Sequence, residues 1–184
     1  MLTLKPDLPF VPVIETERLR LRAHRPSDFD HLYIMWRDER VYRYITGKPS
    51  GLSDTETRLT RAIGHWAAYG FGYWVVEEKE GSAFVGTVGF GQFRREITPS
   101  IDDMPEVGWV LSPRAHGRGY ATEAARAAIA WGDMQFGART TCCIFHPDHA
   151  ASIRVAEKLG YTRWRIGQFN GEATPIYVRV APAP

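Results

Sequence analysis

The sequence of 184 residues has only two cysteines and no long apolar run, which excludes several classes of protein. Its two cysteines, Cys142 and Cys143, are adjacent, which excludes a scaffold of disulfides. No apolar run approaches the roughly 18 residues of a membrane-spanning helix, so no membrane partner is expected. The first residues lack the apolar core of a secretory signal, and with the missing cysteine pairs this predicts the reducing cytoplasm. Internal repeats and low-complexity linkers are also missing.

The sequence also lacks an excess of one charge. Its 23 Lys and Arg residues face 21 Asp and Glu residues, for a net charge of +2. The basic residues are scattered and form no stripe of the kind that binds a duplex, so no nucleic-acid partner is expected. A small basic site for one anionic ligand remains compatible with this balance.

What the sequence does contain is enough apolar material for one packed domain. Apolar residues make up 44%, and there are 6 Trp, 8 Tyr and 9 Phe. We expect a single domain over residues 1–184, with loose ends at about 1–13 and 181–184.

The hydrophobic pattern predicts a mixed α/β domain with the order β-α-α-β-β-β-α-β-α-β-β. This order lacks the regular βαβαβ alternation of a doubly wound fold. The predicted strands are Glu17–Arg22, Phe71–Glu77, Phe84–Phe93, Glu106–Leu111, Arg139–Phe145, Tyr161–Ile166 and Ile176–Val180. The predicted helices begin at Pro26–Asp28 and at Ser53 or Asp54, and cover Gly119–Phe136 and Ala150–Leu159.

The most informative segment is a glycine-rich turn between a predicted strand and a predicted helix. It reads SPRAHGRGYATEA over residues 112–124. The first N–H groups of a helix lack partners within the helix, and the helix dipole adds partial positive charge, so this end binds anions. Gly117 and Gly119 let a phosphate approach the backbone, and Arg114 and Arg118 supply charged donors.

Two other interpretations fit a Gly-x-Gly turn. One is a plain surface turn into a core helix, with no ligand. The other is a dinucleotide fingerprint, which needs a third Gly or Ala within an early βαβ unit. Thr122 occupies that third position, and three predicted strands precede the turn, which argues against the fingerprint.

Three segments carry a resemblance to a known family. The RxxGxG motif at residues 114–119, with Ser-Pro before it and Tyr-Ala-Thr-Glu-Ala after it, resembles the pyrophosphate-binding motif of the GNAT N-acetyltransferases. The segment PDHAASIRVAEKLGY, residues 147–161, is similar to the motif B helix of the RimJ/RimL branch. The opening ETERLRLR, residues 15–22, is similar to the start of that branch. The resemblance covers about Glu15 to Val180.

The resemblance implies both a fold and a ligand. The fold is the GNAT fold of the α/β (α+β) class, a curved mixed sheet of six to seven strands flanked by about four helices, with the fourth and fifth strands splayed apart. Acetyl-CoA lies in that gap, with its pantetheine on strand backbone and its pyrophosphate on the amides of the turn. The cofactor-binding residues implied are Trp109, Val110, Leu111, Arg114, His116, Gly117, Arg118, Gly119, Tyr120, Ala121, Thr122 and His149.

Acetyl transfer to an amine needs a base and benefits from an acid at the leaving thiolate. Glu106 is the candidate base, because it starts the strand that leads to the thioester and Gly108 leaves space on its face. The alternative is a solvated glutamate that merely attracts the cationic amine. Ser152 is the candidate near the sulfur, on a helix face that should be buried. Its alternative is a helix-start serine that bonds backbone.

Two residues depart from the family's pattern. His149 stands where the family often has an asparagine that contacts the cofactor. Ala156 stands where many members carry a catalytic tyrosine, so that route to an acid is absent. The segment from Cys142 to His149 matches no common zinc spacing, because adjacent cysteines diverge in a strand; no metal is expected, and the cysteines should pack as small hydrophobes.

These expectations define an acetyl-CoA-dependent N-acetyltransferase that acts on a primary amine by direct transfer in a ternary complex, as a monomer or a homodimer. The acceptor is a protein N-terminus, a lysine or a small amine. Asp102 and Asp103 would favour a cationic acceptor, or are simply a solvated pair. Three loops should surround the acceptor, namely Tyr44–Ser53, Arg94–Pro105 and Gly167–Pro175.

Two hypotheses from other functional classes remain as alternatives to an acetyltransferase. An acyl-CoA-binding regulator with little catalysis is kept open by Ala156. An interaction domain that has lost the cofactor is the other, and the intact pair of Gly117 and Gly119 argues against it.

Overall fold

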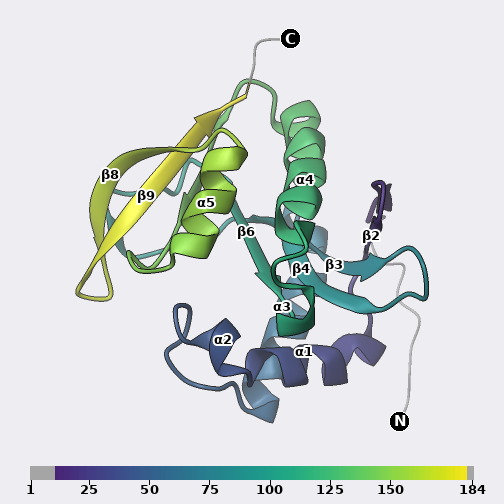
Figure 1. The fold of residues 1–184 in the computed structure, drawn as a ribbon. Coiled ribbons are helices and arrows are strands. Elements are labelled where there is room, and N and C mark those ends of the chain that lie inside the picture. The colour runs from purple at the N-terminus through teal and green to yellow at the C-terminus, as the bar shows by residue number, and fades with distance from the viewer. Residues whose placement is uncertain (1–10, 182–184) are drawn as a thin grey trace.

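A computed structural model describes residues 11–181 of the protein (Figure 1). Its framework is one mixed nine-stranded sheet in the order β1-β2-β3-β4-β6-β7-β9-β8-β5. The strands are β1 Ile14–Glu15, β2 Leu19–Arg22, β3 Tyr73–Glu78, β4 Phe84–Gly91, β5 Ile97–Thr98, β6 Glu106–Leu111, β7 Thr140–Ile144, β8 Thr162–Phe169 and β9 Glu172–Val180. The helices are α1 Phe29–Trp36, α2 Glu39–Tyr42, α3 Leu52–Tyr69, α4 Tyr120–Phe136 and α5 Ala150–Lys158, with 3-10 turns at Pro26–Asp28 and Pro113–Ala115.

The predicted order of elements is confirmed once the three shortest are set aside. These are the two-residue strands β1 and β5 and the four-residue helix α2. The predicted fold class is confirmed as well. The expected loose ends at 1–13 and 181–184 lie mostly outside the described residues.

Helices cover both faces of the sheet. Neighbouring residues of a strand point to opposite faces. On β6, Leu111 packs in the cluster that contains the buried alanines of α4, whereas Val110 packs against the cluster of α1 and α3. The larger core therefore lies between α4 and the sheet, where Ala124 and Ala128 are fully buried and let the helix approach closely.

Local capping sets the ends of α3. Its N-cap is Gly51 rather than the predicted Ser53 or Asp54, because the Asp54 carboxylate reaches back and accepts the Gly51 N–H at 2.9 Å. The helix ends at Gly70, whose φ of 74° is left-handed, as predicted from a C-terminal glycine.

Two predicted loops contain strand. The Arg94–Pro105 segment includes β5, which pairs with β8. The Gly167–Pro175 segment is mostly β8 and β9, because their pairing continues to Phe169 and Glu172 and leaves only Asn170 and Gly171 as the turn. The prediction of a long loop there is therefore wrong.

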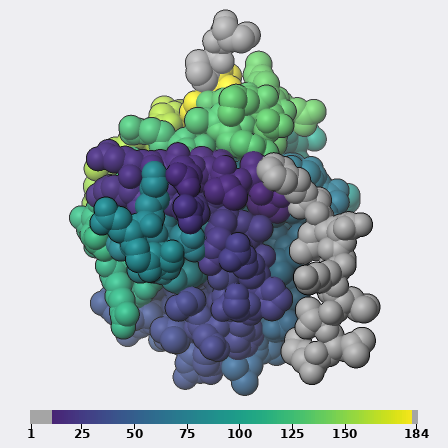
Figure 2. Space-filling view, turned by 90° about the vertical axis from the view of Figure 1, so that its right-hand side faces the viewer, coloured from purple at the N-terminus to yellow at the C-terminus, as the bar shows by residue number. Residues whose placement is uncertain are grey.

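The first described segment is tied to α4. Figure 2 shows this purple segment crossing between the green of α4 and the teal hairpin of β3 and β4. Arg18 forms an ion pair with Glu123 of α4 at 2.6 Å and also donates to the Arg118 carbonyl at 3.1 Å. Within residues 11–181, no helix is long and apolar enough to cross a membrane.

Candidate active site

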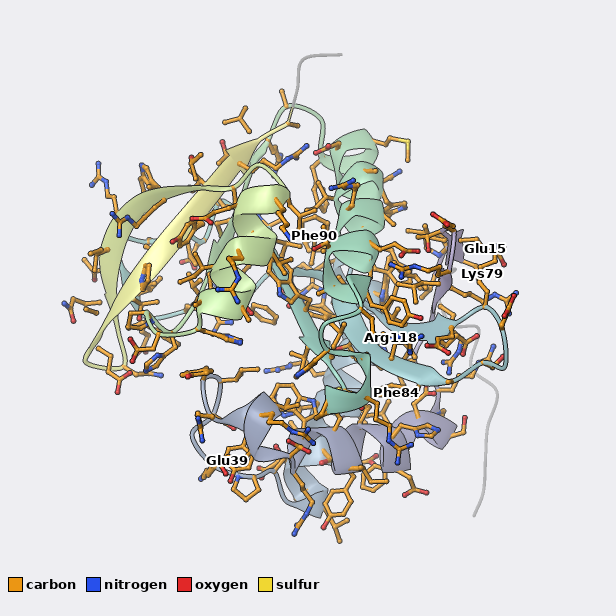
Figure 3. The ribbon with its side chains drawn as sticks, viewed as in Figure 1. Glu15, Glu39, Lys79, Phe84, Phe90 and Arg118 are labelled. Carbon is orange, nitrogen blue, oxygen red and sulfur yellow. The ribbon has the colours of Figure 1, made fainter. Side chains whose placement is uncertain are left out.

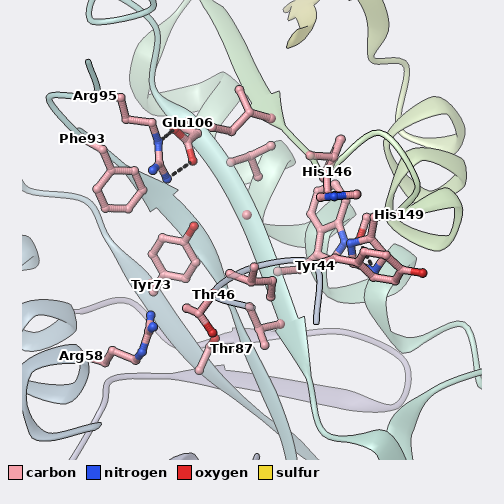
Figure 4. Close-up of a pocket in the computed structure, with 18 of the residues that line it drawn as sticks. Tyr44, Thr46, Arg58, Tyr73, Thr87, Phe93, Arg95, Glu106, His146 and His149 are labelled. Carbon is pink, nitrogen blue, oxygen red and sulfur yellow. Dashed lines mark hydrogen bonds and ion pairs between the residues drawn. The ribbon is translucent and has the colours of Figure 1, made fainter. Parts of the chain in front are cut away.

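The sheet opens between β6 and β7, the two strands expected to splay. They run parallel and share one register pair, Glu106 with Cys142. Beyond that pair, no strand of the described chain pairs with this edge of β6. A cavity of about 560 Å³ lies at the opening, within the range of small-molecule sites. Figure 4 shows the side chains around this cleft.

Five of the predicted site residues line the cleft: Glu106, Trp109, Val110, His149 and Ser152. The predicted turn residues lie outside the cavity, after the carboxyl end of β6. Strand β6 therefore links the two parts of the expected site.

The turn before α4 presents a run of unpaired backbone donors. The N–H groups of residues 117–122 donate to no backbone or side-chain acceptor within the described chain, and the first helical bond runs from the Glu123 N–H to the Gly119 carbonyl at 3.1 Å. Gly117 and Gly119 have φ values of 75° and 78°, which residues with a Cβ rarely adopt. The backbone thus has the donor geometry expected for an anion.

The two arginines of the turn differ in their surroundings. Arg114 is exposed and forms no ion pair with a described residue. Arg118, labelled in Figure 3, forms an ion pair with Glu78 at 2.6 Å. The Tyr120 hydroxyl donates to the same Glu78 oxygen at 2.9 Å. Arg114 therefore offers its charge directly, whereas Arg118 has to leave Glu78 to bind a ligand with its side chain.

His116 occupies part of the expected pantetheine edge. Its Nε2 donates to the Leu111 carbonyl at 3.0 Å. That carbonyl is therefore already bonded. In the β4–β6 register the backbone groups of Val110 face Thr87 of β4, so the open groups nearer the cleft are those of Trp109. The Trp109 ring lies 5.6 Å from the ring of Phe145, where it forms part of the cleft wall.

The Glu106 carboxylate is held by Arg95, a contact that sequence reasoning missed. Arg95 donates from Nε to Oε2 at 2.5 Å and from Nη2 to Oε1 at 2.7 Å. The Glu106 side chain is only 9% exposed. Glu106 is thus in the cleft as predicted, but both of its oxygens are engaged. It accepts a proton only through the lone pairs that Arg95 leaves.

Sequence reasoning also missed Tyr73. A Cβ on Gly108 would collide with the Tyr73 hydroxyl, and a Cβ on Gly89 would collide with the backbone at Tyr73. The space that Gly108 was expected to leave is therefore filled by this hydroxyl. Burial, together with the charge of Glu106, raises the pKa of Tyr73, so its hydroxyl is a hydrogen-bond donor at neutral pH. The two glycines, which lie opposite each other in the β4–β6 register, were the available signal.

Ser152 has the partner that a buried hydroxyl requires. Its Oγ lies 3.4 Å from Nε2 of His149, and the residue is buried. His149 stacks on Tyr44 with ring centroids 4.8 Å apart (Figure 4). Burial lowers the pKa of His149, and the nearby His146 and His116 lower it further, so the ring is neutral at pH 7. Ala156 is fully buried in the core.

The cysteines pack as predicted. Cys142 and Cys143 are fully buried and belong to different core clusters, on opposite faces of β7. Within the described part of the chain, no group of three or more His, Cys, Asp or Glu residues is arranged to hold a metal ion.

The acidic pair does not face the cleft. Asp102 and Asp103 are exposed and line a separate hollow, with Arg139 and Trp164 among its walls. Of the two interpretations of this pair, the structure fits the solvated one, because neither aspartate lines the cleft. All three segments expected around the acceptor do reach the cleft, through Tyr44, Arg95 and Phe169 among others.

Comparisons with known proteins agree with this architecture. Residues 18–162 match the acetyltransferase (GNAT) domain family. The YkkB protein of Bacillus subtilis is 34% identical over 155 residues, which cover 79% of this chain and 82% of YkkB. A putative GNAT-family acetyltransferase from Bordetella pertussis superposes with a TM-score of 0.80 at 28% identity, covering 92% of this chain and 99% of that one.

A more distant likeness concerns the fold alone. RimL, a ribosomal L7/L12 α-N-protein acetyltransferase solved in complex with coenzyme A, superposes with a TM-score of 0.74 at 16% identity, covering 94% of this chain and 100% of that one. The fold and the cleft thus define an acetyltransferase. The chain belongs to the GNAT acetyltransferase family.

Proposed function

We propose that this acetyltransferase moves the acetyl group of acetyl-CoA to a primary amine by direct transfer in a ternary complex. The observation that carries the proposal is the continuity of two features along β6. The strand leads from the cleft with Glu106 to the turn whose six consecutive amides, 117–122, have no acceptor in the described chain. A ligand that is elongated and anionic at one end fits both features.

Different residues bind different parts of acetyl-CoA. The amides of residues 117–122 hold the pyrophosphate, with Arg114 as an additional charged donor, whereas the His116 N–H is already bonded to the Pro113 carbonyl. Backbone groups of Trp109 on the open edge of β6 bond the pantetheine as an added strand would. His149 contacts the ligand at the start of α5. When bound, acetyl-CoA supplies the activated thioester carbonyl.

The chemistry uses groups that line the cleft. A bond forms between the amine nitrogen and the acetyl carbon, the bond from that carbon to sulfur breaks, and one amine proton is released. Glu106 takes that proton, directly or through a water. The Tyr73 hydroxyl lies against Gly108 in the cleft, where it can donate a hydrogen bond to a polar atom of the bound substrates. Ser152 donates a hydrogen bond at the sulfur, and His149 Nε2–H donates to Ser152 Oγ.

One alternative has specific support. An acyl-CoA-binding protein with little catalysis is favoured by Ala156, which supplies no phenol, and by the double hydrogen bond that occupies Glu106. The test is to mix the protein with acetyl-CoA and a panel of amines, with a thiol reagent and mass detection. An enzyme releases thiol at a rate that depends on the amine and yields the acetylated product. A regulator binds acetyl-CoA and gives neither result.

A further inference from the structure

The end of the cleft beside α3 carries positive charge without a matching negative charge. Four arginines line the cleft, together with Glu106 and the exposed Glu172. Two of the arginines are neutralised: Arg95 pairs with Glu106, and Arg43 pairs with Glu39 at 2.6 Å. The other two, Arg58 and Arg61, form no ion pair within residues 11–181.

Arg58 is the more informative of the two. Its guanidinium lies over the Trp36 ring at 3.8 Å, and its Nε is buried with no hydrogen-bond partner in the described chain. Leaving a buried donor unpaired is unfavourable, more so for a charged group. Figure 4 shows its side chain extending into the cavity toward Tyr73. Burial lowers the pKa of Arg58, and the charge of Arg61 lowers it further, against the opposing charge of Asp54 one turn earlier on α3.

The positions of Arg58 and Arg61 on α3 add a repulsion between their charges. Arg58 and Arg61 are three residues apart on α3, so both face the same cavity, and like charges at that spacing destabilise a helix. Arg61 lies over the Phe93 ring at 5.6 Å. An anion bound between the two guanidinium groups would relieve the repulsion between them.

The histidines in this part of the cleft do not change its charge. Burial lowers the pKa of His24 to about 4, so its ring is neutral at pH 7. His65 uses both ring nitrogens: Nδ1 donates to the Phe71 carbonyl at 2.7 Å, and Nε2 accepts the Gln92 N–H at 2.9 Å. That pattern requires one proton and a neutral ring. The charge here therefore comes from the arginines.

We infer that the acceptor is a small amine carrying an anionic group, carboxylate or phosphate, which Arg58 and Arg61 bind. This inference rests on the proposed function for the amine, whereas the anion site stands on the arginines alone. The aromatic rings of Trp36, Tyr73 and Phe93 suit an apolar portion of the same molecule. The acceptor class is thus an amino acid or amino phosphate with an apolar group, not a polycation.

The anion site is tested first with probes that have no amine. Calorimetry measures binding of 3-phenylpropionate, 2-phenylethylphosphonate and the neutral 3-phenylpropanamide, which share one linker, to the full chain. We expect the two anions to bind more tightly than the amide, and the tighter anion identifies the group. Arg58→Met should weaken anion binding at least about tenfold, with Arg61→Met in the same direction. Arg126→Met, an exposed arginine of α4 outside the cleft, is the matched control and should change nothing.

Equal binding of the anions and the amide overturns the anion site, as does unchanged anion affinity in Arg58→Met when thermal melting shows that variant folded. Weakening by added salt supports it, because screened charges bind less well.

The acceptor class is tested by turnover with matched amines. The substrates are L-phenylalanine, L-phenylalaninamide and phenethylamine. Arg58→Met should lower kcat/KM for the amino acid at least about tenfold and leave the two uncharged-tail amines within about twofold. Equal losses for all three overturn the inference. If the anions bind through Arg58 but no amine is acetylated, the proposed transfer fails and the anion site stands. If phenethylamine is acetylated and anions do not bind, transfer stands and the inference fails.

Discussion

At the scale of single residues, the pairing of Glu106 with Arg95 limits how the Glu106 carboxylate can accept a proton from the amine. Arg95 donates to both carboxylate oxygens and so leaves fewer lone pairs for a proton. The same contact keeps Glu106 in one orientation. If Glu106 is the proposed base, this contact positions its carboxylate but limits the lone pairs open to a proton, and substitution of Glu106 tests that role.

Glu106→Gln should lower kcat about 10²-fold or more, with acetyl-CoA binding preserved, because the amide keeps the shape and cannot take a proton. Steady-state kinetics and calorimetry measure both quantities. Glu172→Gln is the matched control, an exposed carboxylate on the cleft wall, and should leave kcat nearly unchanged. A loss confined to KM for the amine would show instead that Glu106 only attracts the cation.

Ser152→Ala should lower kcat roughly ten- to a hundredfold, since one hydrogen bond to the departing sulfur is lost. Ser152→Cys, which is still a donor, should lose less. A thioester with a more acidic leaving thiol should restore part of the rate of the alanine variant. Stopped-flow detection of released thiol measures all three. Wild-type activity in Ser152→Ala with ordinary acetyl-CoA would reduce Ser152 to a structural partner of His149.

At the scale of elements, the start of α4 combines an unusual backbone with open donors. Gly119 has φ 78° and ψ 0°. The N–H groups of residues 117–122 have no acceptor in the described chain. A side chain here both strains the backbone and covers the donors, so a control with the same strain is required.

Gly119→Val should reduce acetyl-CoA affinity at least about tenfold, roughly 1.4 kcal/mol, by calorimetry. Gly70→Val is the matched control, because Gly70 ends α3 with nearly the same backbone angles, φ 74° and ψ 6°. Both variants should lose similar stability, and only Gly119→Val should lose affinity. Equal affinity in the two variants would place the pyrophosphate elsewhere.

Elements that the sequence predicts well are those with a local signal. Strand β6 has the predicted bounds, and α4 follows its alanines and ends at Gly137. The final pair of strands was predicted, but its extension to the two-residue turn was missed, although Asn170 and Gly171 both have positive φ and form the short turn typical of a hairpin. Helix α2 has four residues, too few for a helical period to show.

The candidate site was likewise predictable only where its residues belong to a local motif. Glu106, Ser152 and the turn are identified by local motif, and the structure brings the first two to one cavity. Arg95 comes from a loop, Tyr73 from β3 and Arg58 from α3, and only the packing of these elements brings them to the cleft. Strand register and loop path, which place such side chains, have no signature within the segments themselves.

At the scale of the whole molecule, a buried histidine links folding to pH. His24 is 7% exposed, and its Nδ1 lies 3.1 Å from the Tyr73 carbonyl. Burial lowers its pKa from the ordinary 6.5 to about 4, against the opposing charge of Asp28. Between these values the unfolded chain binds a proton that the folded chain does not, so stability falls as pH falls through this window.

His24→Asn retains a donor for the Tyr73 carbonyl and removes the titration. From pH 7 to pH 5 the wild type should lose about 2 kcal/mol more unfolding free energy than this variant. Urea unfolding at the two pH values measures the difference. Parallel losses in the two proteins would assign the acid sensitivity to other groups.

The single register pair between β6 and β7 has a consequence for how the molecule holds together. Strands β1–β4 and β6 form one ladder, and β7, β9, β8 and β5 form another, joined mainly through the core beneath α4. Each half can therefore open as its own cooperative unit. A ligand seated along β6 and touching α5 bridges them, so hydrogen exchange should slow in both halves together when acetyl-CoA binds, far beyond the residues it contacts.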